Sequence, residues 1–358
     1  MEEVIIVGAG LSGLAAAYYL KKKGIAVLVL EARERWGGRI LTVPAGRNAT
    51  PVDMGATWFA DKHHHLLSLM EELGIPYFKQ FQKGLGIYEN LPPEEVQYFN
   101  VPDAEEPSYR VAGGTSKLIN ALVGKIGKEK IVLNTPIAQV SEHPGHIEIT
   151  SRQGQKYCGQ HLIITIPPFL TISQKIAFNP VLPRELVYIM ANTHTWMGDS
   201  IKFAVEYETP FWRTQGYSGT AFSPAGIAPE MYDHSNFEEI RFALKGFLSA
   251  DASKLNQAER ASLVIKQLTR LFGKAASYYL SYTEKVWQQD IYTYADYGKY
   301  VMPHQHNGHL LFSQPLMGNK LYLAGTETSP TFGGYMDGAV YSGLTAAKKV
   351  HSKLKENK

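Results

Sequence analysis

The chain almost entirely lacks cysteine. Cys158 is the only one among its 358 residues, so no disulfide can form within the chain. Nothing in this composition argues for an oxidising compartment, and a reducing cytoplasm fits. The first apolar strand begins at Val4, which leaves no charged leader or signal-peptide core ahead of it. We therefore expect a cytoplasmic protein.

Long apolar runs and a concentration of one charge are also missing. The best candidate for a membrane span, residues 162–170, is interrupted by Pro167 and Pro168. The 36 Lys and Arg residues stand against 33 Asp and Glu residues, a formal net charge of +3. The basic residues are dispersed rather than gathered into a stripe that could follow a phosphate backbone. We expect neither a membrane nor nucleic acid as a partner.

What the chain does contain is the composition of a globular protein. Apolar residues make up 44% and charged residues 19%, with 32 Gly and 19 Pro scattered along the sequence. Because domains commonly run to ~100–200 residues, the length predicts about two domains, each with room for a sizeable core.

The first forty residues carry a dinucleotide-binding pattern. The apolar run 4–7 is typical of a strand buried on both faces of a parallel sheet, and it leads directly into GAGLSG. Gly8, Gly10 and Gly13 stand in GxGxxG spacing, and a helical pattern follows as far as Gly24. The glycines permit a tight turn, close approach of the backbone to a pyrophosphate and close packing of helix on strand. The expected contacts to the phosphates are Gly8, Gly10, Ser12 and Gly13.

A second strand, residues 26–30, ends in an acid. Glu31 stands where it can accept hydrogen bonds from the hydroxyls of an adenosine ribose, and an acid here disfavours a 2′-phosphate. Glycine spacing alone also occurs in purely structural turns, but strand, turn, helix, strand and acid together are more specific. The pattern predicts a dinucleotide, with NAD as the competitor of FAD.

The stretch EARERWGGRI, which begins at Glu31, separates the two cofactors. It resembles the flavin-dependent amine oxidases of the monoamine oxidase type, in which a second glycine pair and an arginine follow the ribose acid and contact the diphosphate and ribitol of FAD. The alternative is a loop with two solvated arginines. The resemblance implies FAD contacts for Ala32, Arg33, Gly37, Gly38 and Arg39.

Further segments extend the resemblance along the chain. PVDMGATWF resembles the segment that passes close to the flavin ring. GGTSKLINALV resembles the segment that re-enters the FAD domain, and NTPIAQV resembles the strand whose backbone lies against the adenine. In IKFAVEYETPFWR, Lys202 occupies the position of the lysine that reaches the flavin N5 through a water in monoamine oxidases. A strand lysine is usually solvated, but apolar neighbours indicate burial here. The implied site residues are Gly55, Ala56, Thr57, Ile137 and Lys202.

The C-terminal stretch LAGTETSPTFGGYMDGAVYSGLTAAKKV is the most specific match outside the front end. Residues 321–324 predict a strand and 337–350 a helix, whose N-terminus would stabilise negative charge on a reduced flavin. Family members hold the amine between two parallel tyrosines. The resemblance implies Tyr335 as one and, counting from Trp287, Tyr297 as the other, although core burial is the ordinary role of an aromatic residue. The implied FAD contacts here are Trp287, Gly325, Thr326, Gly334, Tyr335 and Met336.

Two features bear on covalent attachment and on metal. The same count puts Asp296 where mammalian monoamine oxidases carry the cysteine that bonds to the flavin, so the resemblance implies noncovalent FAD. The three adjacent histidines at 63–65 suggest a metal site. On a helix they would point in different directions and could not easily converge on one ion, so we expect none.

The chain departs from the resemblance in length. Relatives carry many more residues where this chain has only 75–112, and those residues include helices that roof the substrate cavity. The shortened segment predicts an exposed cavity, or one completed by a homodimer or a partner chain. We expect a doubly wound, Rossmann-like α/β FAD-binding domain from 1–78, 108–188 and 290–358, interleaved with a smaller α+β substrate domain from 79–107 and 189–289.

These features favour an FAD-dependent oxidoreductase that acts on a small amine. Hydride would leave the carbon alpha to nitrogen, giving an imine, with O2 as acceptor and H2O2 as product. Lys202, Tyr297 and Tyr335 would orient, solvate and tune rather than abstract a proton. Two alternatives stay open: a desaturase or protoporphyrinogen-type oxidase with the same glycine motifs, and a low-turnover flavin-binding subunit whose trimmed roof is a docking surface.

Overall fold

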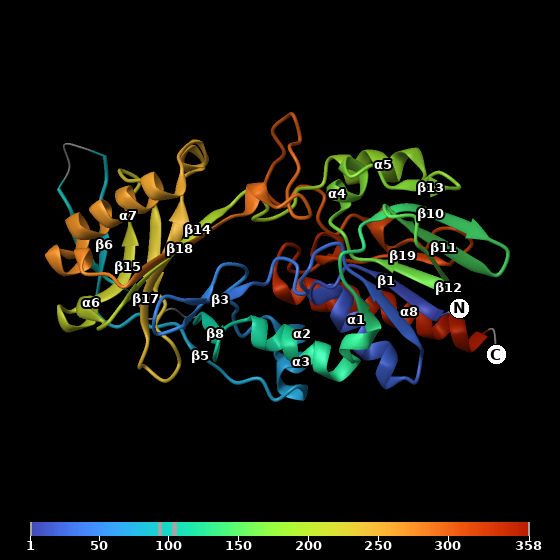
Figure 1. Ribbon diagram of the computed structural model, residues 1–358, viewed down its shortest axis with the longest axis horizontal. Helices are drawn as coiled ribbons and strands as arrows, with labels where there is room; N and C mark the ends of the chain where they lie inside the picture. Colours follow the sequence, from blue (N-terminus) through green and yellow to red (C-terminus); the bar gives the residue numbers. More distant parts are fainter. Residues whose placement is uncertain (1, 92–94, 102–105, 357–358) are drawn as a thin grey trace.

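The computed structural model describes residues 2–91, 95–101 and 106–356. Two bodies lie side by side along the longest axis of the molecule, each built on its own β-sheet (Figure 1). The first and last elements of the chain belong to the same body, so the chain leaves this body and returns to it (Figure 1).

The first body contains an eight-stranded sheet. Strand β1 pairs in parallel with β2 on one side and with β12 on the other, which is the core of a doubly wound sheet. Its strands are β1 (Glu2–Val7), β2 (Val27–Leu30), β9 (Ile131–Val132), β10 (Ile137–His143), β11 (His146–Ser151), β12 (Lys156–Ile164), β13 (Ala177–Asn179) and β19 (Leu321–Leu323). The hairpin of β10 and β11 is antiparallel, and β19 pairs in parallel with the end of β12.

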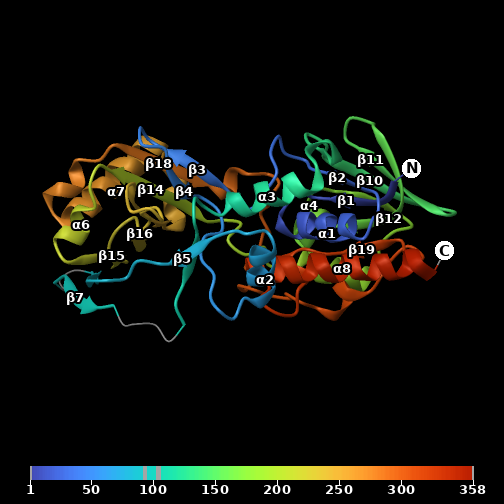
Figure 2. The ribbon, with the colours of Figure 1, turned by 90° about the horizontal axis from the view of Figure 1, so that it is seen from below.

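Side chains of β1 alternate between the two faces of this sheet, and each face has its own helices. Val4 and Ile6 join one buried cluster, whereas Ile5 and Val7 join another. Helices over the first face are α1 (Leu11–Lys22), α2 (His64–Glu72), α3 (Ser116–Ile126) and α8 (Met336–Glu356), and those over the second are α4 (Pro168–Ser173) and α5 (Arg184–Ala191). Figure 2 shows α1, α2, α3 and α8 in front of the sheet.

The second body is a seven-stranded sheet covered on one face by a helix. In spatial order its strands are β18 (Ser281–Val286), β14 (Ile201–Tyr207), β17 (Phe242–Leu248), β16 (Glu230–Asp233), β15 (Tyr217–Phe222), β6 (Leu85–Tyr88) and β7 (Gln97–Asn100). Phe203 and Val205 of β14 pack with Val264 and Leu268 of α7 (Gln257–Phe272), next to the short α6 (Phe211–Thr214). The alternate residues of β14 therefore point away from α7 and toward the first body.

Two small sheets join the bodies. They are the hairpin of β3 (Thr42–Ala45) with β4 (Thr50–Asp53) and the pair β5 (Tyr77–Lys79) with β8 (Tyr109–Val111). Val52 and Met54 pack against Ala204 and Ala243 of the seven-stranded sheet. The N-terminal segment thus reaches the second body before the chain enters it.

The predicted α/β class with a Rossmann-like domain is confirmed by this sheet and its helices. The first two strands and the helix between them lie where the sequence predicts, and the last helix is longer than the expected 337–350. The strands of the seven-stranded sheet fall inside 79–107 and 189–289, the ranges that we propose for the substrate domain.

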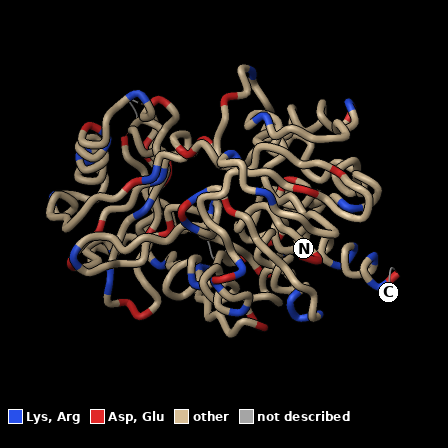
Figure 3. The backbone as a smooth tube through the Cα atoms, turned by 45° about the vertical axis from the view of Figure 1, so that its right-hand side comes forward, with Lys and Arg blue, Asp and Glu red and all other residues tan. Residues whose placement is uncertain are grey.

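Charge is spread over both bodies. Acidic and basic segments alternate along the chain in the view of Figure 3. Within the described ranges, none of the helices is long and apolar enough to cross a membrane.

Candidate active site

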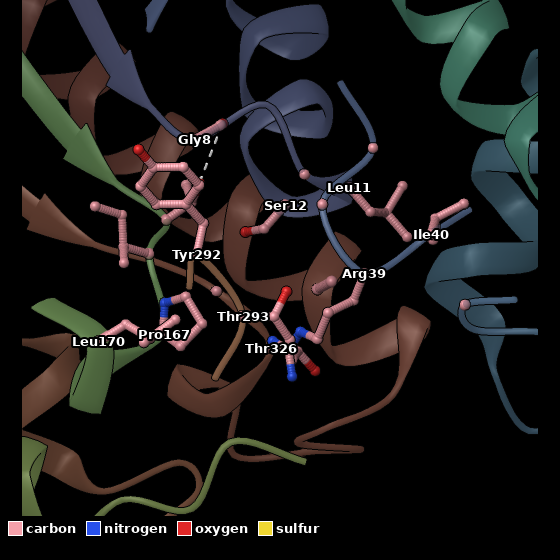
Figure 4. A pocket seen from close by; sticks show the side chains of 18 of the residues that line it. Gly8, Leu11, Ser12, Arg39, Ile40, Pro167, Leu170, Tyr292, Thr293 and Thr326 are labelled. Carbon is pink, nitrogen blue, oxygen red and sulfur yellow. Dashed lines mark hydrogen bonds between the residues drawn. The ribbon is translucent and has the colours of Figure 1, made fainter. Parts of the chain in front are cut away.

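A cavity of about 420 Å³ is lined by residues of both bodies. The first body contributes the turn after β1, the loop after β2, the connection after β12 and the segment before α8. The second body contributes Lys202 of β14, Glu230 of β16 and Phe247 of β17. Arg39 and Thr326 come from segments far apart in the sequence. Figure 4 shows both of them in the part of the cavity that the first body lines.

The glycine turn after β1 leaves two of its glycines no room for a side chain. Gly8 has a φ of 107°, and a Cβ on it would lie 2.4 Å from Thr165 Oγ1. A Cβ on Gly13 would lie 2.0 Å from the carbonyl oxygen of Gly8, so α1 can pack this closely only without one. At Gly10 the nearest atom to a Cβ would be Gly38 Cα at 4.0 Å, and Gly10 lines the cavity. Bare backbone is therefore exposed where a pyrophosphate needs it.

Helix α1 begins at this turn with its N-terminus toward the cavity. Its N-cap residue is Gly10, so no side chain caps the first N–H groups, and Leu11 and Ser12 line the cavity. Uncapped N–H groups at a helix start attract an anion. The turn and the helix start together fit the diphosphate of a dinucleotide.

Glu31 links the turn to the loop after β2. Its Oε2 accepts a hydrogen bond from the backbone N of Ala9 at 2.8 Å, and its Oε1 accepts one from the backbone N of Arg33 at 2.9 Å. Arg33 in turn donates to Asp290 Oδ1 at 2.9 Å and to Thr293 Oγ1 at 2.7 Å. The buried carboxylate is thus held at the cavity edge where the sequence predicts a ribose contact.

The second glycine pair packs against the first. Gly37 and Gly38 have φ values of 105° and 58°, and a Cβ on Gly38 would lie 3.2 Å from Gly10 Cα. The next residue, Arg39, donates to the buried Glu327 Oε2 at 3.0 Å and to the carbonyl oxygen of Trp196 at 3.0 Å. Arg39 therefore joins the front end of the chain to its C-terminal segment across the cavity wall.

Lys202 is buried, as its apolar neighbours in the sequence indicated. Its Nζ donates to the carbonyl oxygen of Gly55 at 2.7 Å and lies 4.9 Å from the centre of the Phe247 ring. Burial lowers the pKa of Lys202 from 10.5 to about 8, although Asp53 and Glu230 act in the opposite direction. A lysine that loses its proton far more readily than a solvated one thus lies against segment 55–57, which lines the cavity.

This lowered pKa predicts how stability depends on pH. Between pH 8 and 10.5 the unfolded chain binds more protons at Lys202 than the folded chain does, so stability rises with pH in this window. Lys202→Met should flatten that rise and increase the free energy of unfolding at neutral pH by on the order of 3 kcal/mol. Urea unfolding of both proteins below and above the window measures the difference. The same pH dependence in both proteins would contradict the assignment.

A second buried lysine supports the same segment. Lys245 of β17 donates from Nζ to Thr57 Oγ1 and lies 4.7 Å from the centre of the Trp58 ring. Burial and the charge of Lys202 hold the pKa of Lys245 well below its usual range. Sequence reasoning missed Lys245, because only the pairing of β14 with β17 brings it beside Lys202.

Another part of the cavity lining is aromatic. The ring of Tyr335 is parallel to that of His304 at a centroid distance of 5.8 Å, and His304 stacks on Trp196 at 4.2 Å. Tyr335 and Trp196 line the cavity, and Tyr335 is 43% exposed, so this wall reaches the surface. A flat, partly open wall of this kind can position a small substrate.

The structure does not bring Tyr297 to this wall, contrary to the expectation of a tyrosine pair. Its hydroxyl accepts from the backbone N of Thr195 at 2.8 Å and donates to the carbonyl oxygen of Thr193 at 2.9 Å. Its ring stacks on Phe169 at 3.8 Å. These contacts fix it in a neighbouring cavity of about 270 Å³, together with Asp296. His304, rather than Tyr297, is the ring parallel to Tyr335.

The other predicted residues converge on the cavity, with the exception of Gly13, which lies beneath the turn. Those in the lining are Gly8, Gly10, Ser12, Glu31, Ala32, Arg33, Gly37, Gly38, Arg39, Gly55, Ala56, Thr57, Ile137, Lys202, Trp287, Gly325, Thr326, Gly334, Tyr335 and Met336. Sequence reasoning missed Thr165, Pro167, Leu170, Trp196, Glu230, Phe247, Tyr292 and Thr293, which also line it. Most of these lie in segments without a recognisable motif.

Two of the three adjacent histidines, His63 and His65, serve packing and hydrogen bonding. His63 packs on Phe332 at 4.8 Å, and His65 Nδ1 lies 3.2 Å from Asp337 Oδ2. In the described part of the chain, no three His, Cys, Asp or Glu side chains are grouped so that they could hold a metal ion.

The family follows from comparison with known sequences. The sequence profile of the family described as flavin containing amine oxidoreductase matches residues 11–91 and 76–351. The chain belongs to this family and is a flavin-dependent, amine-oxidase-like oxidoreductase. The family implies a flavin cofactor. The residues that fit this cofactor line the cavity at the glycine turn after β1 and at the glycine pair Gly37 and Gly38.

Individual relatives match over nearly the whole chain. The protein named "Probable flavin-containing monoamine oxidase A" of Dictyostelium discoideum is 26% identical over 463 aligned residues, covering 99% of each chain. The human "Amine oxidase [flavin-containing] B" is 26% identical over 457, covering 97% of this chain and 86% of that protein. Both alignments are longer than the 358 residues of this chain, so both relatives contain residues that it lacks.

Solved structures share the fold. The cyclohexylamine oxidase from Brevibacterium oxydans IH-35A superimposes with a TM-score of 0.85 at 22% identity, covering 99% of each chain. A putrescine oxidase bound to putrescine gives a TM-score of 0.84 at 24% identity, covering 98% of this chain and 99% of that one.

Proposed function

We propose that the flavin is FAD and that it lies along the cavity without a covalent bond. The bare glycine turn and the uncapped start of α1 suit its diphosphate, and the buried Glu31 suits its ribose. At the other end, Met336 begins α8 and lines the cavity, so the N-terminus of this helix suits negative charge on the ring system.

Noncovalent attachment is supported by the position of the only thiol. Cys158 lies within β12, where it pairs with Glu148 of β11, and it is not among the residues that line the cavity. Asp296, at the position implied for the attachment cysteine, lines the neighbouring cavity and carries no thiol.

We propose that the chain oxidises a small amine and that O2 accepts the electrons, giving H2O2. The observation that carries this proposal is the buried Lys202, held on Gly55 where the two bodies meet at the cavity. When bound, the flavin supplies the hydride acceptor. Lys202 orients a water or substrate atom, and the wall of Tyr335, His304 and Trp196 aligns the amine.

Spectroscopy of the purified protein tests this function. We expect a yellow protein whose FAD leaves on denaturation, whose colour bleaches with an amine under anaerobic conditions, and which releases H2O2 when O2 is admitted. Omission of the amine is the control for spontaneous bleaching. A protein that stays colourless after refolding in excess FAD would exclude the cofactor proposal, and a yellow protein that no amine bleaches would exclude amine oxidation alone.

We also propose a cytoplasmic location, and a second copy or a partner chain over the shortened segment. The single cysteine supports the first. Exposed rings of Tyr88 on β6 and Tyr98 on β7, at the edge of the seven-stranded sheet, support the second. A monomer by size-exclusion chromatography at high protein concentration would argue against a homodimer, leaving only a different partner chain.

A further inference from the structure

The second sheet presents a row of three side chains to the cavity, with opposite charges at its two ends. Glu230 lies opposite Phe247, and Phe247 lies opposite Lys202, in the register of β16, β17 and β14. Residues directly opposite one another project from the same face, and all three line the cavity. Because neighbouring strands are ~4.8 Å apart, the backbones that carry the two charges are separated by roughly 10 Å.

Glu230 is the cavity carboxylate without a cation. Its Oε1 accepts a hydrogen bond from the Tyr232 hydroxyl, and the ion pairs found among the described residues do not include it. Lys202 feels its charge but donates its own hydrogen bond to Gly55. Glu31, by contrast, is held by two backbone N–H groups and lies near Arg33. A partly buried carboxylate that faces a cavity without a cation is costly unless a ligand brings the charge.

Aromatic rings surround this carboxylate. The ring of Trp58 lies 6.2 Å from that of Phe247 and 5.1 Å from that of Tyr232, and Trp58 and Phe247 line the cavity beside Glu230. Such rings pack against an alkyl chain and attract an ammonium group through their faces. The surroundings therefore suit a cation at the end of a hydrocarbon chain.

We propose that Glu230 binds a second ammonium group of the substrate, so that the enzyme prefers aliphatic diamines or longer polyamines over monoamines; this rests on the proposed amine oxidation. The charge of Lys202 repels an ammonium group at its end of the row, and Glu230 attracts one at the other end. A diamine with one charged nitrogen is therefore oriented with that nitrogen on Glu230. Its uncharged amine then lies toward Lys202.

Wild-type holoenzyme tests the preference without any variant. The substrates are an α,ω-diaminoalkane, the n-alkylamine of the same length and the matching ω-amino alcohol, whose far end is polar but uncharged. We expect kcat/KM for the diamine to exceed that for the other two by roughly tenfold to a hundredfold, chiefly through KM. Equal values for diamine and monoamine would overturn the proposal while leaving amine oxidation intact. A yellow enzyme that oxidises none of the three would overturn both.

A pair of variants then assigns the preference to the carboxylate. Glu230→Gln keeps the shape of the side chain and removes its charge. The ratio of kcat/KM for the diamine to kcat/KM for the n-alkylamine should therefore fall close to one. Tyr232→Phe is the matched control, because it removes the hydroxyl that shares the carboxylate and leaves its charge. The ratio should stay at the wild-type value or rise. A Glu230→Gln enzyme that keeps the wild-type preference would overturn the assignment.

Discussion

Gly10→Val is expected to give a folded protein that has lost its flavin. Gly10 has a φ of −77°, which any residue adopts, and a Cβ there would have no atom nearer than 4.0 Å. The fold therefore accepts a side chain, but its methyl groups would fill the side of the turn where we propose the pyrophosphate lies. We expect FAD affinity to fall by at least roughly a hundredfold, as overpacking by about 3 kcal/mol implies. Absorbance of the purified protein and titration with FAD measure this loss.

The control for this result is Gly13→Ala, in the same turn. Its smaller side chain would lie 2.0 Å from the carbonyl oxygen of Gly8, so the strand and helix would have to separate. Both variants should be colourless, but only Gly13→Ala should lower the melting temperature of the apoprotein strongly, as followed by circular dichroism. Retention of flavin by a folded Gly10→Val protein would rule out this turn as the phosphate site.

Lys202→Met is expected to slow the bleaching of the flavin by an amine about a hundredfold, the usual cost of removing one donor aimed at a reaction centre. Methionine fills a similar volume without the Nζ that lies on Gly55. Flavin binding should persist, since the phosphate and ribose contacts lie in the other body. Anaerobic stopped-flow measurements with saturating amine separate this step from substrate binding.

Lys285→Met is the matched control for that experiment. Lys285 lies directly opposite Lys202 across β14 and β18, but its side chain is 30% exposed and it does not line the cavity. The same change of charge and shape on the neighbouring strand should leave bleaching within a few-fold of the wild type. A similar loss in both variants would mean that the sheet, rather than Lys202, had been disturbed.

The sequence predicts the nucleotide end of the cavity because the residues that form this end are close together along the chain. The turn after β1, Glu31 after β2 and the second glycine pair lie close together along the chain, and loops at adjacent strand ends meet at one edge of a parallel sheet. Resemblance extends this to Lys202 and the segment before α8, which the structure brings to the same cavity.

The substrate side depends on pairing that no local pattern encodes. Glu230, Phe247 and Lys245 reach the site only because β16, β17 and β14 are neighbours in one particular register. Tyr297, in contrast, is expected at the substrate wall but lies in the neighbouring cavity. Its segment has no regular secondary structure, so no helical or strand periodicity in the sequence predicts the direction of its ring. Thr165 and Pro167 directly follow β12. They reach the cavity because β12 pairs with β1 and β19, each more than a hundred residues away along the chain, and the local sequence does not encode that pairing.

The close packing of α1 on α8 has a consequence for synthesis of the protein. A Cβ on Gly343 would lie 2.2 Å from the carbonyl oxygen of Ser12, and the hydroxyls of Ser12 and Ser342 are 3.2 Å apart. Helices α1 and α8, from the first and last parts of the described chain, therefore pack directly on each other beside the cavity. A nascent polypeptide emerges N-terminus first, so α1 is synthesised long before α8, and this contact can form only after α8 has emerged.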